Sequence, residues 1–321
     1  QSRRLAAIGG FVLLALWSLG LLTVFALAHT FPDWKSGSFF STAITESPTQ
    51  VDILSVFIPA NIFAALSENH VPAVVLLCIC LGLALAGLDS RHLLISQLDV
   101  MSKVLIRVSS FIIRLAPIGV FAMAASTAGT ISLSEMGRLQ AYLIAYTGGA
   151  LFLGFVVLPG LVTTCTPLRY RDVMFVTKDA MITAFATGKL IIVLPLLIEH
   201  TEKLFAQYQN TEADRSAPAV DVLYPVAYPF PHVGKLLSIL FVPFAAWFLG
   251  NKLSEHEYPT LLIAGLFSYF GGPLLATPFL LDLMHLPHDM FQLFLLAGVY
   301  GERLGDALGA MHLATFTLLT T

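Results

Sequence analysis

Long apolar stretches, separated by short polar ones, dominate this chain. Several of them reach the roughly 20 residues that a helix needs to cross the hydrocarbon core of a membrane. These full-length stretches cover residues 5–28, 102–125, 139–162 and 291–319. Another apolar region, 52–88, is interrupted by the polar residues 67–70, so we predict a span that is divided into shorter segments.

Further apolar stretches are broken near their middle by residues that interrupt helices. Gly188 and Lys189 break the stretch 180–198, and the Gly-Gly-Pro run at 271–273 breaks the stretch 261–284. Between them, 222–249 is crowded with prolines. Proline removes a backbone donor and bends a helix, and freed backbone groups survive at membrane depth only where protein or a wet cavity satisfies them.

The order of these broken stretches repeats along the chain. The stretch 180–198 precedes 222–249, and 261–284 precedes 291–319. Broken segments in corresponding positions of two halves point to the binding site of a transporter. We therefore predict an all-α integral membrane fold with two re-entrant helical hairpins, broken helices and inverted repeats.

The composition supports a multi-pass membrane protein, and we expect it in the inner or plasma membrane. The chain is 57% hydrophobic and 12% charged, with a mean hydropathy of +0.81. A soluble domain averages about 25% charged residues, so this chain has too little polar surface for a soluble α/β enzyme. The net charge is −3 and there is no basic run, so we expect the lipid bilayer as a partner and no nucleic acid.

No arrangement of residues predicts an enzyme, a cofactor or a metal site. We find no Ser/His/Asp set and no phosphate-binding loop. Cys78-x-Cys80 has no companion histidine or cysteine at metal-ligand spacing, so we interpret both as small apolar filler. The chain opens on Gln1, and we expect that a further N-terminal segment precedes it.

Short motifs nevertheless resemble one family of transporters. Residues 58–66 read IPANIFAAL, 115–122 read LAPIGVFA and 178–185 read KDAMITAF, with Leu194-Pro195 following. In order and spacing these resemble the dicarboxylate/amino acid:cation symporters, the glutamate-transporter homologues. The resemblance covers nearly the whole chain and begins at the family's third helix. It therefore implies a divergent member in which the family's first two helices are missing at the front.

The resemblance implies a homotrimer in which each protomer has a static and a moving part. Residues 1–138 correspond to scaffold-type helices with the trimer contact, and 139–321 correspond to the transport-type domain. In the family the transport part moves like an elevator, and its cargo is an acidic or neutral amino acid or a C4-dicarboxylate. Sodium ions or protons drive that transport.

This sequence departs from the family where the family binds its cargo and its ions. The serine-rich tip of the first hairpin is replaced by 187–193, which contains no serine. The family's sodium-binding NMDGT motif is replaced by 231–235, in which only Gly234 matches. The second hairpin tip keeps small residues at 271–273, so a turn remains plausible there. We expect the family's sodium sites to be absent or weakened.

The last helix departs as well. Glu302 and Asp306 align with its first two acids, but the arginine that reads a substrate carboxylate falls on Gly309. The asparagine and the last aspartate of the motif fall on Leu313 and Thr317. A carboxylate needs a donor fork or a cation, so another group must supply it.

Ionisable residues remain in these segments, where charges are costly and are usually paired or functional. We expect the following residues to be buried: Lys189, His232, Lys235, Glu302, Arg303, Asp306 and His312. In one interpretation Lys235 replaces a bound cation and pairs with Glu302 or Asp306, which lie on one helix face. In the other this is a static internal salt bridge. Lys189 either meets an anionic substrate or extends to the cytoplasmic water.

Two sets of candidate site residues follow. The substrate-binding set is Gly188, Lys189, His232, Gly234, Gly271, Gly272 and Pro273, and the ion-coupling or ion-pair set is Lys235, Glu302 and Asp306. The sequence favours a secondary transporter of a small organic anion or amino acid that is sodium-independent or proton-coupled. The alternatives are a non-transporting receptor or sensor that signals through a fused soluble domain outside this sequence, and an anion-conducting pore.

Overall fold

The computed structural model describes most of the chain. The described residues are 2–32, 56–59, 61–67, 70–113, 118–119, 121–122, 125, 129, 133–208 and 217–321. Much of the motif at 115–122 therefore lies outside them, as does Ala60 of the motif at 58–66. Helices and no strands occur over these ranges, which confirms the all-helical prediction for this part of the chain.

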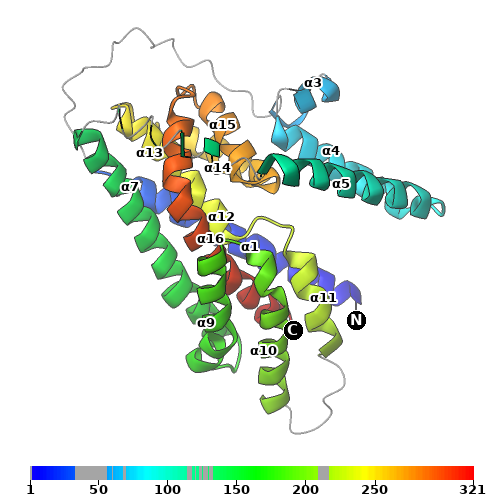
Figure 1. Cartoon of the computed structure of the whole chain (residues 1–321). Coiled ribbons are helices and arrows are strands. Elements are labelled where there is room, and N and C mark those ends of the chain that lie inside the picture. Colours follow the sequence, from blue (N-terminus) through cyan, green and yellow to red (C-terminus); the bar gives the residue numbers. More distant parts are fainter. Residues whose placement is uncertain are drawn as a thin grey trace.

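Helix α16 (Met290–Thr320) runs through the centre of the molecule (Figure 1). Helix α1 (Ser2–Ala28) packs against α16 and against the short helix α12 (Val233–Leu237). Leu16 and Val24 of α1 are fully buried in that contact region. Packing therefore groups α1 with the C-terminal helices, although the predicted division of the chain at 138 places it with the N-terminal ones.

Helices α3 (Ile62–Ser67), α4 (Val71–Ala86) and α5 (Arg91–Ile113) follow in the chain, and α4 and α5 extend away from the other helices (Figure 1). The break between α3 and α4 falls at the predicted polar interruption. Helix α5 begins eleven residues before the predicted start at 102, because the polar turn before the apolar stretch is also helical. The remainder of the predicted span 102–125 lies largely outside the described residues.

The predicted span 139–162 lies within a longer helical run. Helix α7 (Leu133–Phe152) continues through a π-helical turn, η2 (Leu153–Val157), into α8 (Leu158–Cys165). By length and apolar composition, two described helical runs could cross a membrane, and they are Leu5–Ala28 and Met136–Cys165.

Two helical hairpins follow the predicted breaks. Hairpin 1 consists of α9 (Tyr170–Thr187), a tip at 188–189, the 3-10 turn η3 (Leu190–Val193) and α10 (Leu194–Tyr208). Its two arms pack against each other, and α9 packs along α16. The first arm starts at Tyr170, ten residues before the predicted residue 180. The first turns of α9 are polar, so the apolar pattern of the sequence does not include them.

Hairpin 2 consists of α14 (Glu257–Ser268), the 3-10 turn η5 (Tyr269–Gly271), Gly272 and α15 (Pro273–Leu283). Its arms also pack against each other. Gly272 adopts a φ of 87°, in the region that favours glycine, and Pro273 then starts α15. The Gly-Gly-Pro sequence thus reverses the chain at the position that the sequence predicts.

The proline-rich region between the hairpins is a broken helix. Helix α11 (Ala217–Ala227) ends before a non-helical segment at 228–232, and α12 begins after it. The chain then continues through η4 (Ser238–Leu240) into α13 (Phe241–Phe248), which is buried along its whole length. Pro229 and Pro231 lie within the break, as expected for residues that lack a backbone donor.

Candidate functional site: the break before α12

Two hydrogen bonds fix the end of the segment 228–232. The indole N–H of Trp17 donates a hydrogen bond of 2.6 Å to the carbonyl oxygen of Pro231. The next residue, His232, caps α12, because its Nδ1 accepts a hydrogen bond of 3.2 Å from the backbone N–H of Lys235. An accepting Nδ1 carries no proton, so the neutral ring has its proton on Nε2.

This cap aims the free side of the His232 ring at the last helix. Nε2 of His232 lies 3.9 Å from the carboxylate Oδ1 of Asp306. The ring is 1% exposed, and Nε2 has no hydrogen-bond partner among the described residues. His312 is equally buried, and its ring centroid lies 6.5 Å from that of His232. The site therefore contains two buried histidines, each with a ring nitrogen that has no hydrogen-bond partner in the described part of the chain.

A glycine contact allows the two elements to approach this closely. A Cβ on Gly234 would lie 1.9 Å from the carbonyl oxygen of Gly305, so the backbones of α12 and α16 are in direct contact. The hydroxyl of Tyr146 donates to the carbonyl oxygen of Gly301 at 2.9 Å and lies 3.4 Å from that of Gly234. Tyr146 on α7 therefore contacts the backbone of both α12 and α16.

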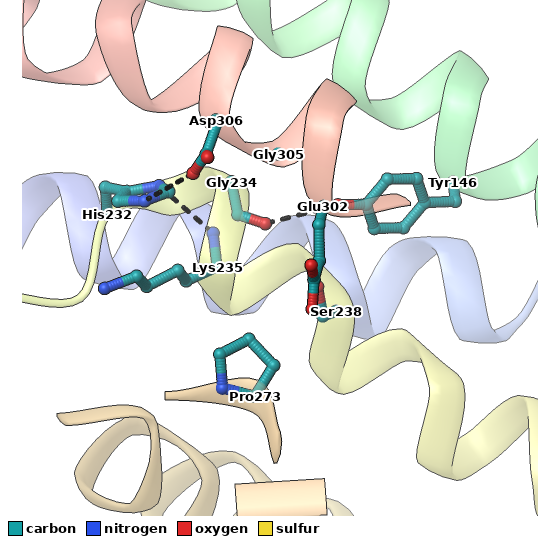
Figure 2. Close-up of a pocket in the computed structure, with 9 residues that line it drawn as sticks. All are labelled: Tyr146, His232, Gly234, Lys235, Ser238, Pro273, Glu302, Gly305 and Asp306. Atoms are coloured by element: carbon teal, nitrogen blue, oxygen red, sulfur yellow. Dashed lines mark hydrogen bonds and ion pairs between the residues drawn. The ribbon is translucent and has the colours of Figure 1, made fainter. Parts of the chain in front are cut away.

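Two adjoining cavities open on either side of this contact. The first has a volume of about 190 Å³ and faces hairpin 2. Figure 2 shows its lining, which is Tyr146, His232, Gly234, Lys235, Ser238, Pro273, Glu302, Gly305 and Asp306. The second has a volume of about 280 Å³ and faces hairpin 1. Its lining is Gly188, Lys189, Leu190, Ile191, Tyr228, His232, Lys235 and Asp306.

The shared wall of the two cavities is His232, Lys235 and Asp306. Each cavity adds one charge of its own, which is Glu302 in the first and Lys189 in the second. The first cavity therefore combines two carboxylates with one ammonium, and the second combines two ammonium groups with one carboxylate. An anion is favoured electrostatically in the second cavity and a cation in the first.

The charged side chains around the first cavity point in different directions (Figure 2). In Figure 2 Asp306 points toward His232, and Glu302 points toward Ser238 and Pro273. Lys235 extends away from Glu302, below the His232 ring. The contact that the structure places in this cluster joins the neutral His232 ring to the carboxylate of Asp306, and the pairing of Lys235 with a carboxylate stays a prediction.

Most of the predicted site residues are brought together. Gly188 and Lys189 line the second cavity, and His232, Gly234, Lys235, Glu302 and Asp306 line the first. Of the hairpin 2 tip, Pro273 lines the first cavity, whereas Gly271 and Gly272 line neither. Gly271 instead packs against α4, where a Cβ would lie 3.1 Å from Cγ1 of Val71.

The predicted burial of the charged residues is only partly correct. His232 and His312 are buried, and Lys235 and Asp306 are half-buried. Lys189, Glu302 and Arg303 are exposed in the single chain, so the prediction of burial is wrong for these three. They lie at the open rims of the cavities and at the hairpin 1 tip, where apolar sequence neighbours do not cover them.

Arg303 has a role that the sequence did not reveal. Its Nη1 donates a hydrogen bond of 2.9 Å to the carbonyl oxygen of Ala186, in the last turn of α9. Cations stabilise the carbonyl end of a helix, both as donors and through the helix dipole. The chain then turns at Gly188, whose φ of 62° favours glycine. Arg303 thus fastens the tip of hairpin 1 to α16.

The sequence also matches known proteins over most of its length. The model of the sodium:dicarboxylate symporter family matches residues 1–311. The proton/glutamate-aspartate symporter of Escherichia coli (strain K12) is 28% identical over 201 residues, which is 62% of this chain and 43% of that protein. The C4-dicarboxylate transport protein of Anaeromyxobacter sp. (strain K) is 28% identical over 210 residues, 64% of this chain and 44% of that protein.

A third relative extends the match slightly. C4-dicarboxylate transport protein 1 of Bradyrhizobium diazoefficiens is 27% identical over 230 residues, which is 71% of this chain and 50% of that protein. The chain spans about half the length of the curated relatives it matches.

Proposed function

Because this chain belongs to the sodium:dicarboxylate symporter family, we propose that it is a secondary active transporter of a small organic anion or amino acid. The observation that carries the proposal is the pair of adjoining cavities with opposite charge balance, separated by His232, Lys235 and Asp306. By name, the relatives are C4-dicarboxylate transport proteins and a proton/glutamate-aspartate symporter. C4-dicarboxylates, glutamate and aspartate are all small organic anions, the class of cargo proposed here.

The carboxylate of the cargo binds in the cavity that faces hairpin 1. Lys189 at the hairpin tip and Lys235 at the start of α12 both line this cavity of about 280 Å³. Two ammonium groups provide the cationic partners that a carboxylate requires in the absence of an arginine fork. Lys189 and Lys235 are therefore the substrate-binding residues of the proposal, with the backbone of Gly188 beside them.

Transport does not use sodium. The family's sodium-binding motif is reduced to Gly234, and the adjacent position holds the ammonium of Lys235. Asp306 is the carboxylate that lines both cavities, so it is placed to exchange a proton with either one. We assign Asp306 as the proton-coupling group, with His232 as the neutral donor that faces it and Glu302 as a second acid in the first cavity.

The moving part comprises hairpin 1, the broken helix, hairpin 2 and α16. Helix α1 moves with them, because it packs on α12 and α16. Both hairpins are re-entrant, and they belong to inverted repeats that carry the cargo by an elevator-type movement. The protein is a multi-pass homotrimer of the inner or plasma membrane, and α4 and α5 belong to its static part.

Solute counterflow in proteoliposomes tests the transport claim without assuming a coupling ion. Vesicles are loaded with one unlabelled compound at a time from a panel of amino acids and C4-dicarboxylates, and uptake of the same compound in labelled form is followed. We expect counterflow for one chemical class in the wild type. Lys235→Met should reduce it strongly, because the variant binds the carboxylate more weakly. Lys103→Met should leave it unchanged, because Lys103 on α5 pairs with Asp99 away from the cavities.

The same vesicles separate a transporter from a receptor. Absence of counterflow for every compound, together with saturable binding of one of them, would contradict transport and support the receptor alternative. That alternative is favoured by the simultaneous change of three ion- and cargo-binding motifs. Passive, non-saturable flux of anions would instead indicate a pore.

A further inference from the structure

The end of α1 is joined to the start of hairpin 2 by one histidine. Nδ1 of His29 lies 2.8 Å from the backbone carbonyl oxygen of Phe25, and Nε2 lies 2.9 Å from Oε1 of Glu255. Glu255 lies two residues before α14, the first arm of hairpin 2. The contact therefore links segments 226 residues apart in the chain.

Both ring nitrogens of His29 face acceptors. A carbonyl oxygen and a carboxylate oxygen can only accept, so each nitrogen must carry a hydrogen for both bonds to form. Only the doubly protonated imidazolium has two N–H groups, and the neutral ring has one. Loss of one proton from His29 therefore removes one of the two bonds.

The surroundings of His29 include other charged and titratable groups. The His29 ring stacks on Tyr258 of α14, with centroids 5.3 Å apart and an interplanar angle of 29°. In the loop before α14, Lys252 donates to the carbonyl oxygen of Phe31 at 3.3 Å. Glu257 is held by Ser254, whose backbone N–H and hydroxyl both donate to it at 2.7 Å. Glu255 is thus the carboxylate that remains directed at His29.

The chemical environment favours the imidazolium at mildly acidic pH. The hydrogen bond to Glu255, followed by that to Phe25, raises the pKa of His29, and slight desolvation and nearby Lys252 oppose the shift. The position at the carbonyl end of α1 also favours a cation. His29 is 44% exposed, so protons reach it directly from solution.

We propose that His29 and Glu255 form a pH-sensitive latch, which holds the start of hairpin 2 against α1 when His29 is protonated and releases it when His29 loses a proton. Hairpin 2 leads from this latch through α14 to Pro273, which lines the first cavity. The latch therefore regulates the mobility of the hairpin that contributes Pro273 to the first cavity. The claim concerns the hairpin itself, and its test does not depend on transport.

Thiol accessibility at the hairpin 2 tip measures that mobility. The background carries serine in place of the exposed Cys78, Cys80 and Cys165. The reporter is Leu274→Cys in hairpin 2, and the matched control is Ile191→Cys in hairpin 1. The two native side chains are 53% and 54% exposed, so the ratio of their maleimide labelling rates cancels the ionisation of the thiol itself.

With His29 and Glu255 intact, we expect the ratio of labelling at position 274 to that at 191 to rise about twofold to fivefold between pH about 5.5 and about 8, as for the loss of an exposed ion pair. His29→Gln and Glu255→Gln should each give the high ratio at both pH values. A ratio that is independent of pH with the latch residues intact overturns the proposal. So does a pH-dependent ratio that persists in either variant, and the exposed Glu255 provides a test that does not risk the fold.

Discussion

Gly234 of α12 and Gly305 of α16 are in backbone contact, since a Cβ on Gly234 would lie 1.9 Å from the carbonyl oxygen of Gly305. This approach places His232, two residues before Gly234, opposite Asp306, one residue after Gly305. The geometry of the candidate site therefore depends on two residues that carry no side chain.

A side chain at position 234 should separate these two helices. Gly234→Ala requires the backbone of Gly305 to move, and overpacking of this kind costs about 1–3 kcal/mol. We expect a lower midpoint of thermal unfolding in detergent and loss of substrate counterflow. Gly298→Ala in the partner helix α16 is the matched control, because a Cβ there meets no atom within 4 Å. Equal stability of the two variants would contradict the packing account.

Removal of Arg303 should loosen the tip of hairpin 1. Arg303→Gln loses the cationic donor to the carbonyl oxygen of Ala186, and hydrogen bonds to charged groups contribute about 1.5–3 kcal/mol when they are well formed. Because Arg303 is exposed, we expect the lower end of this range, seen as about tenfold faster maleimide labelling of Ile191→Cys in a background without native cysteines. Labelling of Leu274→Cys in hairpin 2 should not change, and an equal effect on both tips would indicate general unfolding.

The two lysines should contribute unequally to substrate binding. Lys235 is half-buried and lines both cavities, whereas Lys189 is exposed at the hairpin tip. A hydrogen bond to a charged group contributes about 1.5–3 kcal/mol, so Lys235→Met should weaken binding of the carboxylate cargo roughly 10- to 100-fold. Lys189→Met should weaken it by less than about tenfold. Competition of unlabelled cargo for labelled cargo measures both, and the opposite order would place the carboxylate at the tip.

The stability of the protein should fall with rising pH through the titration of His29. Its pKa is raised in the folded state, chiefly by the hydrogen bond to Glu255, so the folded protein binds the proton more tightly than the unfolded one. That stabilisation is fully present below the ordinary pKa of about 6.5 and is lost as the pH rises through the raised value. Thermal unfolding at pH about 5.5 and about 8.5 measures it.

The control for this titration is His29→Gln. The wild type should unfold at a higher temperature than the variant at the lower pH, and the two should converge at the higher pH. A difference between them that grows as the pH rises would have the wrong sign for a histidine whose proton is held by a carboxylate.

The breaks in the helices could be predicted from the sequence, because they depend on local backbone chemistry. Gly188 and Gly272 adopt positive φ at the two hairpin tips, and the prolines around 229–231 interrupt the helix between the hairpins. The sequence predicts starts for α5 and α9 that are too late, because the first turns of both helices are polar although their backbone hydrogen bonds are helical.

Contacts between distant helices could not be predicted in this way. The alternation of apolar and polar residues does not show that Tyr146 reaches Gly301, that Trp17 reaches Pro231, or that Arg303 reaches Ala186. These bonds depend on which helix faces lie together in three dimensions. The opposite charge balance of the two cavities also depends on the three-dimensional packing. Lys189 lines the cavity on one side of Asp306, and Glu302 lines the cavity on the other side.

The central claim is that Lys235 and Asp306 replace the sodium dependence of the family with a dependence on protons. Accumulation of the labelled cargo identified by counterflow is measured in proteoliposomes under an inward sodium gradient, and with choline in place of sodium under an acidic exterior. The account predicts accumulation in choline that follows the pH gradient, and loss of that response with retained exchange in Asp306→Asn. Accumulation that requires sodium and ignores the pH gradient would contradict it.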